Sequence, residues 1–379
     1  MGNDNSTQSQ QPSEKFKAAF KKVADVAQFP TCANFWMYKE KIRPILEQIS
    51  GNEQIKQCMK VQRSDMYTTA MSHYKGKVGE IRRKSVSIRH ESLMIIFDDS
   101  GQFDYDGGGY RREFYSTFFQ KAIRDRGLFV GNYPRLLPNF TQDRLDDLTA
   151  VGIGIVEAIL NFDCGFPYLH PGLYHFMMDH DDFEHYLMVD DIPNPAVKHL
   201  VNLMKNREQL ITLLTRYSII DERRPAIDAL KKGLNYLKFL EKIKDVSLLE
   251  PLFVHSEEYS INKQYLKKLL LPALEGLNAA NDKLKKAKEY ALRSVNEIND
   301  DEAKTLYHFI TGLSSPSVSQ EQLRAEFIMS NPRQKLPEAM TCFETLMIPV
   351  GNKDYEEFKE SFHHAIKTFD KLAVNKPCC

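Results

Sequence analysis

The chain has 379 residues, of which 42% are hydrophobic and 27% are charged, with 51 basic and 51 acidic side chains. This composition is typical of a globular protein of two or three domains. A net charge of zero argues against nucleic acid as the main partner, because phosphate binding needs a basic surplus. No apolar run approaches the roughly 18 residues of a membrane span, and the N-terminus lacks a signal-peptide core.

The first 57 residues divide into a polar tail and a helical extension. Residues 1–14 are almost without apolar side chains, so they cannot offset the entropy of ordering and should be disordered. Residues 15–57 have a helical pattern with an apolar, aromatic stretch over 35–46. We expect this extension to pack on the first domain.

Residues 58–276 are predicted to form a large, mostly helical body. The expected elements are a strand over 93–97, helices over 110–125, 143–160 and 262–275, and a helical region from about 195 to 245. The spacing of Phe114, Phe118 and Ile123 places them on the apolar side of the helix over 110–125. Apolar residues in the last part of this body recur every three or four positions and predict one buried helical stripe. The stripe consists of Ile227, Leu230, Leu234, Leu237 and Leu240.

Residues 277–282 (LNAAND) follow Gly276 and are the candidate hinge, because small and turn-forming residues absorb backbone rotation. Residues 283–375 are predicted to form a small α/β piece. Its expected elements are helices over 283–298 and 301–312, strands near 323–328 and 345–350, and a final helix from Tyr355. The expected fold class is therefore α+β and mostly helical.

Six cysteines are scattered without a CxxC pair. They are Cys32, Cys58, Cys164, Cys342, Cys378 and Cys379. This spacing does not resemble a disulfide framework and indicates a reducing compartment. We expect a cytoplasmic protein, with the nucleus as the alternative location.

Four motifs occur in an order found in one enzyme family. They are VQRSD (61–65), FDYDGGGYRREFYSTFF (103–119), HFITG (308–312) and LPEAMTCFETLMIP (336–349). Together they resemble the signatures of HECT-type ubiquitin ligases, over residues 58–372. The segment GFPYLHPGLYHFM (165–177) is similar to the divergent branch that includes the G2/M-phase-specific ubiquitin ligase.

The resemblance implies a bilobed molecule. An N-lobe over 58–276 would bind a ubiquitin-conjugating enzyme through residues 165–260, and a hinge over 277–282 would join it to a C-lobe over 283–375. The C-lobe would carry Cys342 as the residue that holds ubiquitin as a thioester before its transfer to a substrate lysine. The implied partners are ubiquitin, the conjugating enzyme and the substrate, and neither a metal nor an organic cofactor is implied.

Cysteine suits this reaction because its thiolate attacks a thioester readily and the product is another thioester of similar energy. Thr341 is a candidate to orient the sulfur or to donate to the developing oxyanion. Attack by lysine needs a deprotonated amine, for which Glu338 and Glu344 are the local carboxylates. Phe343 is expected to point inward and anchor the segment in the core.

The family often has His where this chain has Met340, and Asn where it has Glu344, which bears on the rate of the reaction and not on the assignment. Two other departures support a rival hypothesis, a catalytically weak or inactive HECT-like interaction module. The loop after Gly312 is short, and the terminal NKPCC lacks the phenylalanine that many members carry. A third hypothesis is a lipid-anchored adaptor, because Gly2 fits a myristoylation pattern and Cys378-Cys379 resembles prenylated ends.

Three other patterns suggest ligand sites, and a structural interpretation is preferred for each. Glycines 107–109 are expected to form a tight turn with ion pairs at Arg112 and Glu113, because the lysine of a phosphate-binding loop is missing. Gly152 and Gly154 are expected to allow close helix packing rather than dinucleotide binding. Histidines recur every five residues at His170, His175, His180 and His185. Because five helical residues turn each side chain away from the last, we expect a solvated surface or a loop there rather than a metal site.

Overall fold

The structure, a computed structural model, describes residues 35–50, 55–83, 91–97, 109–161, 164–204, 207–256, 260–317 and 323–372. Helices dominate these residues, and three small sheets accompany them, so the predicted α+β, mostly helical fold is confirmed. The predicted tail, most of the helical extension, Gly2 and Cys378-Cys379 lie outside the described residues. Within the described part of the chain, no helix has the length and hydrophobicity needed to cross a membrane.

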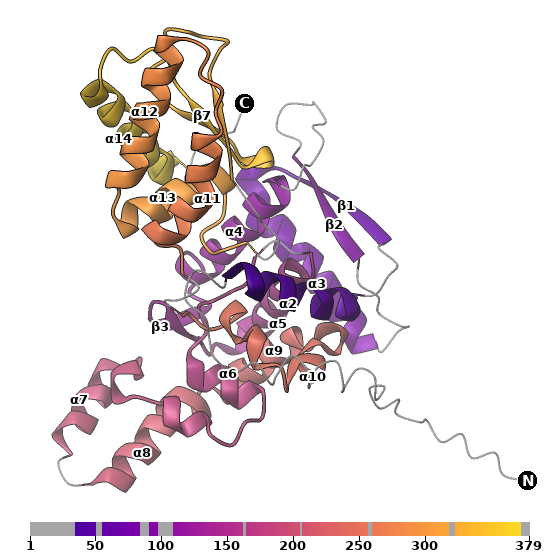
Figure 1. Ribbon diagram of the computed structural model, residues 1–379. Coiled ribbons are helices and arrows are strands. Elements are labelled where there is room, and N and C mark those ends of the chain that lie inside the picture. Colours follow the sequence, from indigo (N-terminus) through magenta and orange to yellow (C-terminus); the bar gives the residue numbers. More distant parts are fainter. Residues whose placement is uncertain are drawn as a thin grey trace, which may run out of the picture.

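The N-terminal part of the fold combines long helices with a two-stranded parallel sheet (Figure 1). Its elements are α2 (Phe35–Ser50), β1 (Ile55–Val61), α3 (Met66–Arg83), β2 (Glu91–Phe97) and α4 (Gly109–Arg124). The predicted strand and the helix that follows it are therefore confirmed. Phe114 and Phe118 are fully buried, as their spacing on α4 predicted.

Two helices cross closely in the centre of this body, α5 (Leu145–Leu160) and α9 (Arg224–Leu234). A β-carbon on Gly152 would lie 2.7 Å from the carbonyl oxygen of Leu230, and one on Gly154 would lie 2.8 Å from the ring of Phe118. Larger residues would force the helices apart, so these glycines serve packing, as predicted. The predicted stripe on α9 and beyond is buried, with Leu237 partly so.

The helical region expected from about 195 to 245 is divided into shorter elements. The middle of the chain contains β3 (Phe129–Asn132), β4 (Arg135–Pro138), α6 (Pro171–Met177), α7 (Pro195–Leu203), α8 (Glu208–Arg216) and α10 (Phe239–Ile243). A π-helical turn follows α8. Leu237 and Lys238 have positive φ angles, which interrupt the helical backbone between α9 and α10. Helices α7 and α8 pack against each other and project from one end of the molecule (Figure 1).

The C-terminal part gathers at the opposite end (Figure 1). Its helices are α11 (Lys263–Glu275), α12 (Asp282–Glu297), α13 (Asp300–Thr311) and α14 (Tyr355–Leu372), and its strands are β5 (Arg324–Phe327), β6 (Glu338–Met340) and β7 (Thr345–Ile348). In the sheet β7 is central, parallel to β5 and antiparallel to β6. The prediction missed β6, which is only three residues long.

Asparagine side chains begin three of these helices. Asn262, Asn281 and Asn299 each accept a hydrogen bond from a backbone N–H in the first turn, at 2.8 to 3.0 Å. Asn281 thus caps α12 within the segment predicted as the hinge. Helix α11 packs against α12, α13 and β5, so the predicted boundary after residue 276 separates helices that contact each other. The sequence of 277–282 could not reveal this packing.

Candidate active site

Cys342 lies in a tight connection between β6 and β7, which we name the Cys342 turn (residues 341–344). Met340 pairs with Thr345 across the two strands, so four residues reverse the chain. Residues Thr341–Phe343 form a single 3-10 turn, and Glu344 follows with a left-handed φ of 53°. For Cys342 itself the structure describes the backbone alone.

Arg112 on α4 holds the Cys342 turn from the other half of the chain. Its Nη2 donates to the carbonyl oxygen of Thr341 at 2.8 Å, and its Nη1 lies 3.0 Å from Oε1 of Glu344. Its Nε donates to the carbonyl oxygen of Thr311, at the end of α13, at 3.4 Å. The guanidinium is almost buried, and its fork of donors matches this set of oxygens.

Glu344 has a strained backbone conformation in the turn, and its ion pair with Arg112 helps to stabilise it. A left-handed backbone costs about 1–2 kcal/mol for a residue with a β-carbon, and asparagine tolerates it better than most. Glu344 adopts this conformation at the position where the HECT pattern often has Asn. Its ion pair with Arg112 offsets part of the backbone strain.

A family model described as HECT-domain (ubiquitin-transferase) matches residues 157–373, more than half of the chain. The chain belongs to the HECT family. The match spans α6 to α14 and includes the Cys342 turn, but it begins after the GGGYRREF segment. Arg111 and Arg112 join that segment to the matched part, Arg111 through the carbonyl oxygen of Asn161 and Arg112 through Thr311 and the Cys342 turn. No curated protein matched the chain.

The HECT family is a family of ubiquitin transferases, whose general partners are ubiquitin, conjugating enzymes and protein substrates. The predicted ion pairs of Arg112 and Glu113 are both present in this HECT chain. Arg112 pairs with Glu344, and Glu113 lies 3.0 Å from Arg63. The sequence predicted that these residues would be paired, but not with which partners.

The prediction for Phe343 is wrong, because its side chain is 58% exposed. The prediction assumed the alternation of a strand, but the 3-10 turn interrupts that two-residue period. Burial resumes at Thr345 and Leu346, where β7 begins. Thr341 contributes its carbonyl oxygen to the contact with Arg112, and the role proposed for its hydroxyl stays a prediction.

The two candidate bases have different surroundings. The carboxylate of Glu344 is held by Arg112. Glu338 lies on β6, is exposed, and accepts a hydrogen bond from Nε2 of Gln334 at 2.6 Å. An amide leaves the negative charge of Glu338 in place, so of these two residues Glu338 is the better proton acceptor.

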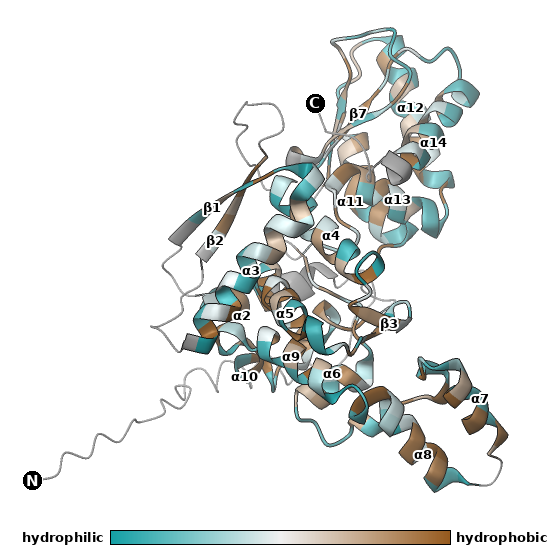
Figure 2. Ribbon diagram, turned by 180° about the vertical axis from the view of Figure 1, so that it is seen from behind, coloured by the Kyte–Doolittle hydropathy of each residue, from teal (hydrophilic) through white to brown (hydrophobic). Residues whose placement is uncertain are grey.

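A second feature of the HECT domain is an exposed apolar face on the projecting helices, which we name the α7–α8 surface. Its residues are Leu200, Leu203, Leu210, Leu213 and Tyr217, between 37% and 64% exposed. Hydrophobic colour runs along both helices in Figure 2. Apolar residues that gather on one face in this way indicate a protein-binding site.

The base of this projection is anchored by a buried polar cluster. Asp191 directly precedes the α7 region, and its carboxylate accepts hydrogen bonds from Arg135 at 2.7 and 2.9 Å and contacts Nε2 of His170 at 2.9 Å. Burial opposes ionisation of Asp191, but the hydrogen bonds from His170 and Arg135 outweigh it and lower its pKa to about 2. His170 lies in the loop before α6 but is fully buried, and His175 is buried within α6, so the expected solvated surface is wrong for both.

Proposed function

We propose that this HECT chain is a ubiquitin ligase that accepts ubiquitin from a conjugating enzyme as a thioester on Cys342 and transfers it to a substrate lysine. One observation carries the proposal. Phe343, the residue after the cysteine, is 58% exposed, and Met340, two residues before it, is 36% exposed, so the backbone that carries Cys342 runs at the surface. A nucleophile that exchanges acyl groups with another protein needs such a position.

The two chemical steps make different demands on the chain. In the first, the Cys342 sulfur attacks the incoming thioester, one C–S bond replaces another, and the conjugating enzyme leaves as its thiolate. In the second, a lysine amine attacks, the C–S bond breaks and an amide forms. Glu338 is our candidate to take the proton of the attacking amine, since it is exposed and lies on the strand that leads to the turn.

The conjugating enzyme is proposed to dock on the α7–α8 surface. Exposed leucines and a tyrosine supply the apolar centre that a specific interface needs. The surface lies at the opposite end of the molecule from α12–α14 (Figure 1). The contact between Arg112 and the Cys342 turn must therefore open before the thiol meets its donor.

The pivot for this movement is proposed to precede α11 rather than to lie at 277–282. Helix α11 packs with the other C-terminal helices, so it should move with them. The divergent HECT branch, the cytoplasmic location and lipidation at Gly2 or Cys378-Cys379 remain predictions from the sequence.

A loading assay tests the proposal. The chain is incubated with ubiquitin, its activating enzyme and a panel of conjugating enzymes, and the products are separated on a non-reducing gel. Wild type and the matched control Cys58→Ala, which alters an exposed cysteine on β1, should both give a reducible ubiquitin adduct. Cys342→Ala should give none, and Cys342→Ser should give an adduct that survives reduction. Ligation by Cys342→Ala would refute the mechanism, whereas the absence of an adduct with wild type would favour the interaction-module hypothesis.

A further inference from the structure

Two histidines that helical geometry would separate meet at the end of α6. The backbone N–H of His180 donates to the carbonyl oxygen of His175 at 3.0 Å, and that of Asp179 donates to Phe176 at 3.2 Å. Asp179 has a left-handed φ of 56°. This is the Schellman ending, in which the chain reverses and the residue two past the helix faces the last turn. The expectation that residues five apart diverge is therefore wrong here, and the two Nδ1 atoms lie 2.9 Å apart.

The surroundings of the rings leave both Nδ1 atoms available as ligands. Nε2 of His180 lies 3.2 Å from the carbonyl oxygen of Lys244, which can only accept a hydrogen bond. Nε2 of His175 lies 3.4 Å from the carboxylate of Glu250, in an ion-pair contact rather than an aligned hydrogen bond. The acceptor at Nε2 of His180 favours a proton there, whereas Nε2 of His175 is buried without a hydrogen-bond partner. The two Nδ1 atoms face each other, and without a proton between them they present a pair of lone pairs. Such a pair is repulsive unless a proton or a cation lies between the rings.

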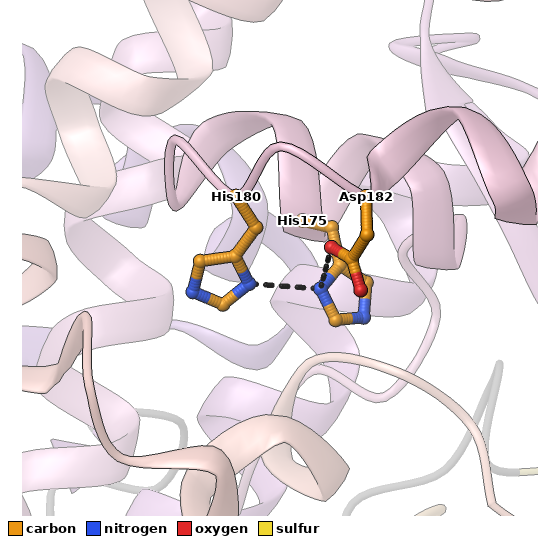
Figure 3. A group of neighbouring side chains, drawn as sticks. All are labelled: His175, His180 and Asp182. Atoms are coloured by element: carbon orange, nitrogen blue, oxygen red, sulfur yellow. Dashed lines mark hydrogen bonds and ion pairs between the residues drawn. The ribbon is translucent and has the colours of Figure 1, made fainter.

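A carboxylate completes the cluster. Oδ1 of Asp182 lies 3.8 Å from Nδ1 of His175, and the three ligand atoms all lie within 4.8 Å of one another (Figure 3). His175 is buried and stacks on Tyr186 with ring centres 4.2 Å apart, whereas Asp182 is exposed. One ligand is therefore held rigidly, and the other two lie on the side from which an ion would enter.

We propose that His175, His180 and Asp182 bind a divalent transition-metal ion, of which Zn²⁺ fits best. Zinc bonds of about 2.0–2.1 Å place tetrahedral ligand atoms about 3.3–3.5 Å apart. This value lies between the 2.9 Å that separates the two Nδ1 atoms and the 3.8 Å from Nδ1 of His175 to Oδ1 of Asp182. Two imidazoles and one carboxylate suit zinc, whereas calcium and magnesium prefer oxygen ligands alone. Lys244 and Glu250 supply the outer contacts that fix the orientation of ligating histidines.

The role of the ion would be structural. His175 lies in the last turn of α6, and His180 and Asp182 lie in the connection that follows this helix. Lys244 lies directly after α10. An ion here would tie these segments together at the base from which the chain continues to α7. The ion takes no part in the chemistry of Cys342, so the site does not depend on the proposed function.

Metal binding tests the proposal with Zn²⁺ and Co²⁺ as probes. Metal-free protein is dialysed against zinc chloride and its bound zinc is measured, and cobalt absorption reports the ligands. Wild type and the control His185→Ala, an exposed histidine five residues on, should bind one equivalent through nitrogen and oxygen. His180→Ala and Asp182→Asn should bind at least about 100-fold more weakly. Cys342→Ala should bind as wild type does, which separates this test from that of the ligase mechanism.

Thermal unfolding guards against a variant that merely fails to fold. Without metal, His180→Ala should unfold in a cooperative transition like that of His185→Ala. Zinc should raise the midpoint of wild type and of His185→Ala but not that of His180→Ala. Equal zinc binding by His180→Ala and wild type would overturn the proposal. Cobalt spectra that show only thiolate charge-transfer bands would also overturn it, because the ligands would then be cysteines. The absence of binding by wild type would overturn it too, and the contact between the two Nδ1 atoms would then be explained by a shared proton.

Discussion

The Cys342 turn and the α7–α8 surface differ in whether their groups already have partners within the chain. Arg112 holds the Cys342 turn through a carbonyl oxygen and a carboxylate. On the α7–α8 surface, Leu203 and Leu213 are more than 60% exposed. Hydrogen bonds and ion pairs exchange with water at modest net cost, whereas an apolar surface gains free energy only when a partner covers it. The Cys342 turn is therefore held by contacts that can break and form again, whereas the α7–α8 surface gains stability only when another molecule covers it.

The largest expected effect comes from charging the open surface. Leu203→Asp combined with Leu213→Asp should slow loading of Cys342 about 100-fold at limiting conjugating enzyme, because two interface anchors are lost. Stability should change little, since both side chains are exposed. The measurements are the loading rate and the urea midpoint.

Met329→Asp is the matched control, because Met329 is equally exposed but lies beyond β5 in the C-terminal part. If the control slows loading as much as the double variant does, charge alone explains the effect and the comparison fails.

An intermediate effect is expected at the anchor of the projection. The folded-state pKa of Asp191, about 2, is below the ordinary value of 3.8, so its stabilising effect is complete above pH 3.8 and lost as pH falls toward 2. Asp191→Asn should destabilise the protein by about 1–2 kcal/mol near pH 7, after allowing for screening by solvent. It should also flatten the fall in stability on acidification, measured by urea unfolding between pH 5 and 2.

Asp190→Asn is the control for this prediction. Its carboxylate is 86% exposed and pairs with Lys198 on the surface. If the stability of the Asp190 and Asp191 variants depended on pH in the same way, the buried ion pairs of Asp191 would contribute no more to stability than an exposed ion pair does.

The smallest effect is expected at the Cys342 turn. Glu344→Gln weakens the contact with Arg112 that must open before loading, and it should speed loading about fivefold, or about 1 kcal/mol. Arg112→Met should act in the same direction. The rate is measured in single-turnover loading from a preformed conjugating-enzyme thioester.

Glu326→Gln is the control, an exposed glutamate on β5 of the same sheet. Slower loading by Glu344→Gln, with the control unchanged, would show that Arg112 positions the turn for reaction instead of restraining it.

Local patterns in the sequence predicted much of the fold. The apolar spacing of Phe114 and Phe118 predicted α4, and Gly152 and Gly154 predicted a close helix crossing, because each depends on neighbouring residues and backbone geometry. Four motifs in order, of which LPEAMTCF is the part around Cys342, predicted the HECT family, and the family match over residues 157–373 confirms it.

The arrangement of the site could not be predicted in the same way. The exposure of Phe343 depends on a 3-10 turn that replaces a strand, and the meeting of His175 and His180 depends on the left-handed Asp179. The contact of Arg112 with Thr341 and the grouping of α11 with α12 are tertiary, and a single sequence carries no local signal for either.

The contact between Arg112 and Thr341 also bears on how the protein is made. The two residues are 229 positions apart, so α4 leaves the ribosome long before the Cys342 turn exists. Contacts of such long sequence separation carry a large loop-closure entropy and form late. Until residues 341–344 have been synthesised, Arg112 lacks the oxygens of Thr341 and Glu344, so the contact between α4 and the Cys342 turn belongs to the late steps of folding.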